Sequence, residues 1–182
     1  NRIDEHIDNK SEIFKGNGIL KSPPKLEPFT FLVGLPNVET AKILPFYTPI
    51  DENTPTLKKD DTFVAKGRIL ELFEGNHILL KRRVMQESLP IISYVDKACA
   101  FWNSAYSITS KDCIEELKKI YGLLVSDLST YYQFITSSNW GVATRPEIAL
   151  DEYVSLPSGN IQDESKFVEL VTEFIESVRS KS

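Results

Sequence analysis

Three successive positive side chains, Lys81, Arg82 and Arg83, follow a short apolar run and are the clearest candidates for chemistry in this chain. Lys and Arg bind phosphate oxygens, and Arg also pairs with guanine through two hydrogen bonds. Residues 58–83, which end with these three, hold seven basic and four acidic residues, a net charge of +3. On a regular strand Lys81 and Arg83 share one face and Arg82 takes the other, so they form one patch only if the strand bends. The segment is a candidate polyanion-binding surface, and a merely solvated charged face is the alternative.

The overall charge works against a nucleic-acid partner. The 182 residues carry a formal net charge of −5, and phosphate neutralisation by Lys and Arg supplies most non-specific DNA affinity. The negative charge is concentrated in residues 147–182, which hold eight acidic and three basic residues, a net charge of −5. The basic segment keeps its local charge, and this distribution weakens the objection.

Catalytic chemistry has little support in the sequence. There is no glycine-rich phosphate loop, no Gly-x-Ser-x-Gly and no His-Glu-x-x-His. A hydrolytic triad would have to use His77, because the only other histidine is His6, and a strand histidine more often bonds to backbone. Adjacent acidic pairs such as Glu115-Glu116 point in different directions on a helix or strand. We expect no catalytic residue, no metal site and no cofactor site in these residues.

The composition is that of one folded domain, with 41% hydrophobic and 26% charged residues. No run approaches the ~20 apolar residues of a membrane span, and the N-terminus lacks the order of a signal peptide, so we expect a cytoplasmic protein. Cys99 and Cys113 have no companion Cys or His at metal-ligand spacing and are expected to be buried thiols. Residues 1–17 are polar with weak periodicity. We expect them to be a linker or tail from an upstream catalytic domain, and residues 18–182 to form the domain.

The sequence of residues 15–108 predicts short strands. Prolines interrupt every apolar run between residues 15 and 57, so mostly loop and short edge strands are expected there, with Phe29–Leu35 as the only well-formed strand. Residues 62–108 consist of short β-rich runs separated by turn signals, which is typical of an antiparallel meander. We expect one more strand at residues 148–156.

Helical periodicity begins near residue 114. Apolar residues recur three or four apart over residues 114–135, as one buried helical face requires. Gly122 and the Ser126-Asp127 pair offer a break, so two consecutive helices are expected. A closing amphipathic helix begins near residues 160–163. The sequence predicts an α+β fold with a mixed, mainly antiparallel sheet, a helical pair and a C-terminal amphipathic helix.

Several stretches of the chain occur in the same order in a known family. They are LELFEGNHILLKRR at 70–83, ISYVDKACAFWNSAYSI at 92–108, the Tyr-Tyr helix leading into Ser-Ser-Asn-Trp-Gly within 121–157, and the Leu-Pro motif with its closing helix at 156–178. Together they resemble the C-terminal target-recognition domain of adenine-specific DNA methyltransferases and type II restriction-modification enzymes. The resemblance covers roughly residues 62–180. The chain departs from the pattern at residues 125–127, Val-Ser-Asp, where the family usually has Asn-Ser-Lys or Asn-Ser-Ser.

The resemblance implies sequence-specific recognition of duplex DNA by a specificity-subunit-like domain that is itself not catalytic. Methyl transfer from S-adenosylmethionine would belong to a methyltransferase domain of the same parent chain, and whether the parent also cleaves DNA stays open. The candidate DNA contacts are the basic and amide side chains Lys66, Arg68, Lys81, Arg82, Arg83, Gln86, Asn139 and Arg145. For Asn139 and Arg145 the alternatives are a turn former and a surface charge. We expect Tyr131, Tyr132 and Trp140 in the core.

Two other classes of function remain open. A protein-interaction domain would use the closing helix or the Pro-rich residues 15–57 as its docking surface and would tolerate the negative charge. A small intracellular hydrolase with an unfamiliar site is the third interpretation. Affinity for duplex DNA that falls steeply with salt would separate DNA recognition from both.

Overall fold

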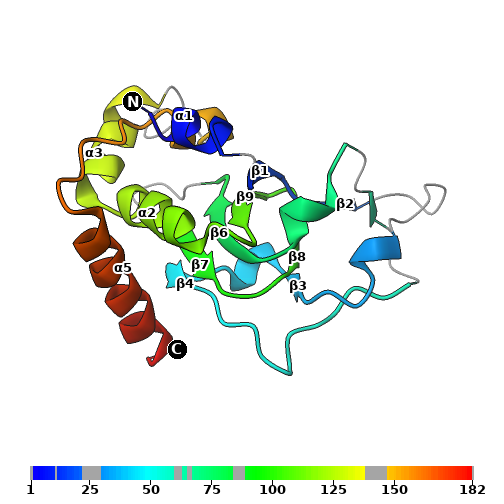
Figure 1. Ribbon diagram of the computed structural model, residues 1–182. Coiled ribbons are helices and arrows are strands. Elements are labelled where there is room, and N and C mark those ends of the chain that lie inside the picture. The colour runs from blue at the N-terminus through cyan, green and yellow to red at the C-terminus, as the bar shows by residue number, and fades with distance from the viewer. Residues whose placement is uncertain are drawn as a thin grey trace.

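The computed structural model describes residues 2–10, 12–21, 30–59, 63–64, 67–83, 89–137 and 147–181. Within these ranges the chain has an α+β fold with a mixed, mainly antiparallel sheet, as the sequence predicts. Figure 1 shows the longer helices gathered on one side of the sheet and the shortest strands on the other. Of the described helices, none is long and apolar enough to cross a bilayer.

Five strands form the central sheet, in the order β1-β9-β6-β7-β4. They are β1 (Ile13–Asn17), β4 (Phe46–Tyr47), β6 (Asn76–Lys81), β7 (Ile92–Val95) and β9 (Ala105–Ser110). Strand β4 runs parallel to β7, and the other neighbours are antiparallel. Two short pairs flank this sheet: β2 (Leu20–Lys21) with β5 (Phe63–Val64), and β3 (Asn37–Val38) parallel to β8 (Ala100–Phe101).

Both faces of the central sheet are covered by apolar side chains. Along β6, Ile78 and Leu80 belong to a core shared with the helices, whereas Leu79 belongs to a second core. All three side chains are completely buried. Successive side chains of a strand point to opposite faces, so a continuous apolar run such as residues 78–80 suits a strand that is buried on both sides.

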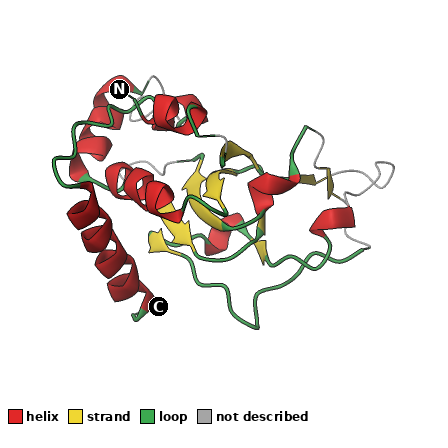
Figure 2. Ribbon diagram, in the orientation of Figure 1, coloured by secondary structure: helices red, strands yellow, loops and turns green. Residues whose placement is uncertain are grey.

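The helices and 3-10 turns surround this sheet (Figure 2). They are α1 (Ile3–Asp8), α2 (Ile114–Leu124), α3 (Asp127–Thr136), α4 (Leu150–Val154), α5 (Glu164–Arg179), and the 3-10 turns η1 (Thr30–Leu32), η2 (Thr40–Lys42) and η3 (Leu70–Phe73). The predicted break between two helices is confirmed, because Ser126 Oγ accepts a hydrogen bond from Ser129 N at 3.2 Å and caps α3. The closing helix also begins as predicted, after Asp163, whose carboxylate accepts from Lys166 N at 2.9 Å.

Two predicted strands are wrong. Residues 148–156 contain helix α4, which begins where the Glu152 carboxylate accepts a hydrogen bond from Ala149 N at 2.8 Å. A short apolar run does not distinguish a helix from a strand by its periodicity, and here the acidic first turn favours the helix. In the described part of Phe29–Leu35 the chain forms η1 instead, and Gly34 takes a φ of 91° that ends any extended run.

The structure differs from the expected linker at residues 1–17. Helix α1 and strand β1 lie in this stretch, and β1 pairs with β9 along its whole length. Ile3, Ile7 and Ile13 are buried in the core shared with the helices. Three isoleucines spaced among many polar residues give a weak pattern, yet their burial anchors the stretch to the fold. Its connection to an upstream catalytic domain stays a prediction.

The face that α3 buries is also not the predicted one. Leu128, Tyr131 and Ile135 are 76%, 65% and 60% exposed, whereas Ser129 and Gln133 are buried. The new cap at the start of α3 turns this helix relative to α2, so the apolar periodicity does not continue across the break. Tyr131 therefore lies outside the core, while Tyr132 packs partly buried against it.

Candidate nucleic-acid interface

The three basic residues lie where β6 leaves the sheet. Strand β6 ends at Lys81, but backbone hydrogen bonds continue beyond it. Arg82 N donates to Ser104 O at 3.1 Å, and Ile148 N donates to Arg82 O at 2.9 Å. Arg83 then pairs with Glu147 in an isolated antiparallel bridge. The segment is held on both sides, so these side chains start from a fixed backbone.

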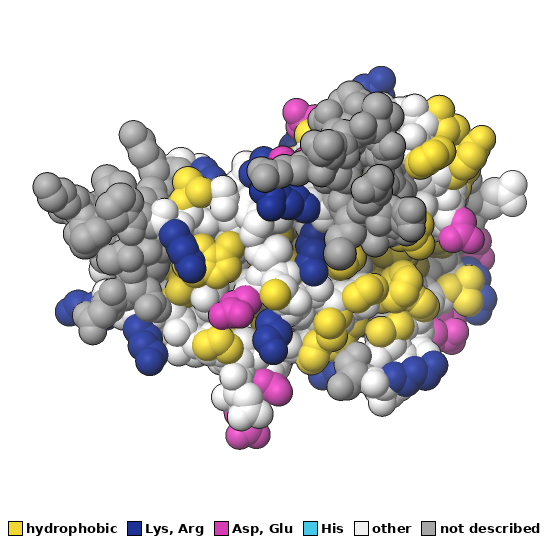
Figure 3. Space-filling model, turned by 180° about the vertical axis from the view of Figure 1, so that it is seen from behind, with side chains coloured by type: hydrophobic (Ala, Val, Ile, Leu, Met, Phe, Trp, Pro, Cys, Tyr) yellow, Lys and Arg dark blue, Asp and Glu magenta, His cyan; other side chains and the backbone are white. Residues whose placement is uncertain are grey.

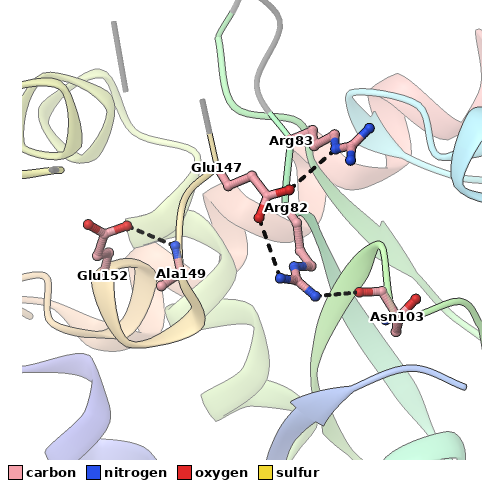
Figure 4. Close-up of polar contacts among 6 residues, drawn as sticks. All are labelled: Arg82, Arg83, Asn103, Glu147, Ala149 and Glu152. Atoms are coloured by element: carbon pink, nitrogen blue, oxygen red, sulfur yellow. Dashed lines mark hydrogen bonds and ion pairs between the residues drawn. The ribbon is translucent and has the colours of Figure 1, made fainter. Parts of the chain in front are cut away.

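Arg82 and Arg83 converge on one carboxylate. Arg82 Nη2 lies 3.5 Å from Glu147 Oε2, and Arg83 Nε lies 3.3 Å from Glu147 Oε1 (Figure 4). Alternation along a regular strand would separate the two guanidinium groups. Here strand β6 ends at Lys81, one residue before Arg82, so the alternation does not extend to Arg83. The chain bends at Arg82, as the sequence prediction of a single patch requires. Arg82, Arg83 and Glu147 together carry a net charge of +1.

The two arginines differ in exposure and in what holds them. The side chain of Arg82 is 32% exposed and that of Arg83 is 70% exposed. Arg82 Nη1 also donates to Asn103 O at 3.2 Å, and its guanidinium lies 5.4 Å from the centroid of the Tyr106 ring. Arg82 therefore fastens the turn between β8 and β9 to the end of β6. Arg83 is the more accessible of the two to a ligand from solvent.

Lys81 is partly buried, and Arg68 is hydrogen-bonded to backbone carbonyls. Burial lowers the pKa of the Lys81 ammonium group, and the Lys81 carbonyl accepts from Tyr153 Oη at 3.1 Å. Arg68 Nε donates to the carbonyls of Asn17 and Gly18 at 2.9 and 3.2 Å, at the junction of β1 and β2. Arg68 thus binds backbone at some distance along the chain from Arg83, and its contact with DNA stays a prediction.

The other candidates fall outside what the structure describes. Lys66, Gln86, Asn139 and Arg145 lie in the undescribed segments, as does Trp140. Of the eight predicted contacts, the structure brings together the side chains of Arg82 and Arg83 at Glu147, and Lys81 precedes them as the last residue of β6.

Sequence reasoning missed two residues of this interface, Glu147 and Asn103. Glu147 neutralises part of the charge of two arginines that precede it by more than sixty positions, and no local pattern indicates that contact. Asn103 lies in the turn between β8 and β9, where the sequence shows only one of the turn signals between short β-rich runs. The structure places both against Arg82 (Figure 4).

The hollows of the described surface are acidic rather than basic. One hollow, of about 530 Å³, is lined by residues of 37–55, and its charged members are Glu39, Lys42 and Asp51. A second, of about 270 Å³, is lined by four acidic residues and one lysine, which are Glu12, Glu71, Glu74, Asp112 and Lys111. Lys and Arg side chains are instead spread over the middle of the rounded face seen in Figure 3. A polyanion would therefore meet this protein on an outward-facing surface.

His77 has the surroundings of a core residue. Its side chain is completely buried, and its Nδ1 lies 3.0 Å from Ser107 Oγ. Burial lowers the pKa of His77 to about 3, and the Phe73 backbone acts weakly in the opposite direction. A neutral imidazole without access to solvent cannot take a proton from a substrate in the bulk. Cys99 is likewise buried, and Cys113 is half-buried with its thiol donating to the Glu12 carboxylate.

Comparison with known proteins gives a distant structural likeness. No protein-family model matches the sequence, and no curated protein matches it. Among solved structures, an HsdS subunit from Thermoanaerobacter tengcongensis matches 93% of this chain at 13% identity and a TM-score of 0.41. A structure from work on complex assembly and conformational transition of the type I R-M system matches 94% of this chain at 12% identity and a TM-score of 0.40. The chain spans 39% and 40% of the length of these two structures.

Proposed function

We propose that this chain is a target-recognition domain that binds a specific sequence of duplex DNA, as the specificity part of a cytoplasmic restriction-modification adenine methyltransferase. The domain itself carries no catalytic step in this proposal. Methyl transfer from S-adenosylmethionine is assigned to a methyltransferase domain of the same parent chain. The observation that carries the proposal is the exposed Arg83 guanidinium, held beside Lys81 and Arg82 on a fixed backbone at the end of β6.

Two kinds of observation support this proposal. The motifs at 70–83, 92–108 and 156–178 resemble those of target-recognition domains and follow the same order. The first of these motifs ends at the basic residues that lie together at the end of β6. Phosphate contacts from such residues fix the position of a protein on the duplex, while other side chains reach the base edges.

The charge distribution limits how DNA would bind. With a net charge of −5, long-range attraction to the duplex is weak, and the affinity must come from the local basic surface. A duplex would lie against the outward-facing end of β6 rather than in the acidic hollows. The number of phosphate contacts, and with it the dependence of affinity on salt, is then set by that surface.

A salt titration tests the proposal. The affinity of the 182-residue chain for a mixed-sequence duplex is measured by fluorescence anisotropy between about 50 and 200 mM salt. We expect affinity to fall with salt, and Arg83→Ala to lower the slope of log K against log salt by about one. The matched control is Arg179→Ala, because Arg179 is also exposed and also forms one ion pair, with Asp96 at 3.0 Å. Binding that ignores salt, or an equal effect of both variants, would contradict the proposal.

A protein-interaction domain is the second candidate, and one observation favours it. Leu128, Tyr131 and Ile135 follow each other at three- and four-residue intervals and form an exposed apolar face on α3. This face suits contact with another protein surface, such as the methyltransferase domain of the parent chain. If the chain binds no duplex in the salt titration, this second candidate becomes the better one.

A further inference from the structure

The turn between β8 and β9 is fixed beside the basic residues. Asn103 N donates to Ile19 O at 2.8 Å, and Ala105 N donates to Trp102 O at 2.9 Å across the turn. The Asn103 carbonyl accepts from Arg82 Nη1 at 3.2 Å. Backbone groups on both sides of Asn103 are therefore held by β1–β2 on one side and by the end of β6 on the other.

The other side chains of this turn already have partners. The Ser104 hydroxyl is hydrogen-bonded to the Thr40 hydroxyl. The ammonium group of Lys21 lies over the Trp102 ring, 5.7 Å from its centroid. In contrast, the Asn103 carboxamide has no hydrogen-bond partner within the described part of the chain, and Asn103 is partly exposed.

The backbone does not explain why asparagine stands at this position. Asn is favoured where φ is positive, because its short side chain tolerates the left-handed region. Among the described non-glycine residues, only Phe46 has a positive φ. The turn at Asn103 is therefore compatible with most residue types, and its carboxamide is free to serve a ligand.

We propose that Asn103 contacts a base edge of the bound duplex and determines specificity for an A·T pair at one position. This inference rests on the proposed function. The carboxamide offers a donor and an acceptor side by side, the arrangement that pairs with N7 and N6 of adenine in the major groove. Arg83 supplies the phosphate contact nearby, and Arg82 fixes Asn103 through its carbonyl. A side chain that starts from a fixed backbone loses little freedom on binding, which favours accurate base recognition.

Selection from a duplex pool tests this inference. Duplexes with a randomised core are bound to the 182-residue chain at low salt, and the enriched sequences are compared for wild type, Asn103→Ala and Asn103→Asp. We expect the wild type to prefer A·T at one position, and Asn103→Ala to lose about ten-fold discrimination at that position alone. Asn103→Asp keeps the size of the side chain but offers only acceptors, so its preference should move toward a cytosine N4 donor.

The control and the outcomes separate this inference from the proposed function. Asn160→Ala removes an exposed carboxamide elsewhere and should leave the enriched sequence unchanged. If the wild type enriches a sequence and both Asn103 variants enrich the same one, Asn103 does not determine specificity, although the domain still recognises DNA. If the wild type enriches nothing and shows no salt-dependent binding, the proposed function itself fails.

Discussion

At the scale of single residues, Glu147 controls how much charge the end of β6 presents. Its two oxygens are shared between Arg82 at 3.5 Å and Arg83 at 3.3 Å, so one negative charge offsets two positive ones. Such partly exposed ion pairs contribute only about 0–1 kcal/mol to stability. Phosphate oxygens can therefore compete with Glu147 for the exposed Arg83.

Replacing Glu147 with glutamine should strengthen DNA binding. Glu147→Gln keeps the shape of the side chain and removes the charge that competes with phosphate. We expect a higher affinity at low salt and a slope of log K against log salt that is steeper by about one. Thermal unfolding should change little, because the lost ion pairs are partly exposed and contribute little to stability.

The control for this variant is Glu115→Gln on α2, which makes the same charge change at an exposed carboxylate. Affinity that rises equally in both variants would show that only net charge matters. Affinity that falls in Glu147→Gln would mean that the two arginines do not contact DNA, or that Glu147 itself contacts a base.

The residue scale also shows what the sequence could indicate. The basic character of Lys81, Arg82 and Arg83 is visible because the three are adjacent. The carboxylate that neutralises part of their charge is not visible, because Glu147 reaches them only through the folded chain. The position of Asn103 is hidden for the same reason, because its carbonyl meets Arg82 only in the folded chain.

At the scale of elements, the packing of α2 on α5 depends on Gly122. A Cβ atom at this position would lie 2.5 Å from Val171 Cγ2 and 2.8 Å from Phe167 Cζ. Such distances force a packed neighbour to move. The sequence suggested Gly122 as part of a helix break, but α2 continues through it and ends at Leu124. The glycine is explained by the close approach of α5.

Replacing Gly122 with alanine should destabilise the protein, although alanine favours a helix by about 1 kcal/mol over glycine. We expect Gly122→Ala to lower the free energy of unfolding by about 1–3 kcal/mol, because overpacking outweighs the helix preference. The measurement is urea unfolding followed by circular dichroism. In Gly122→Ala with Val171→Ala, the second change removes the closest contact, so the double variant should lose less than the sum of the two single variants.

The outcome for Gly122→Ala is informative in either direction. Stabilisation by about 1 kcal/mol would mean that α5 moves away from α2 at no cost, and that the two helices are not tightly packed. Strictly additive effects in the double variant would mean that Gly122 and Val171 do not share a contact.

Elements with strong local signals were predictable, and weaker ones were not. The capping residues Ser126 and Asp163 fix the starts of α3 and α5 through bonds within one turn, so the sequence alone indicates them. Helix α4 has only five residues, too few for its periodicity to be recognised. The exposed face of α3 follows from the angle between two helices, which depends on tertiary packing.

At the scale of the whole molecule, β6 joins both halves of the structure. Its Ile78 and Leu80 belong to the core beneath the helices, its Leu79 belongs to the core beneath the short strands, and its last residue leads to Arg83. Both cores therefore hold the strand that leads to the candidate interface. The order of the strands could not be predicted from the sequence, because β9 pairs with β1 across about ninety residues and no local pattern specifies that pairing.

The last prediction concerns residues 1–17, which the polar composition suggested to be a linker. The structure gives them strand β1 beside β9, and the side chains of Ile3, Ile7 and Ile13 are 0%, 2% and 5% exposed. Burial of three such side chains contributes about 5 kcal/mol or more, which approaches the whole stability of a typical domain.

Deleting residues 1–17 should therefore abolish cooperative thermal unfolding, because β9 would lose its outer neighbour and the core would be open at one edge. Removal of residues 180–182 is the control, because they follow α5 and residues 180 and 181 are exposed. This deletion should leave the melting temperature close to that of the intact chain. A cooperative transition at nearly the same temperature after the N-terminal deletion would restore the interpretation of residues 1–17 as a tail. Loss of that transition would instead place the boundary of this domain before α1, and any upstream domain would have to end there.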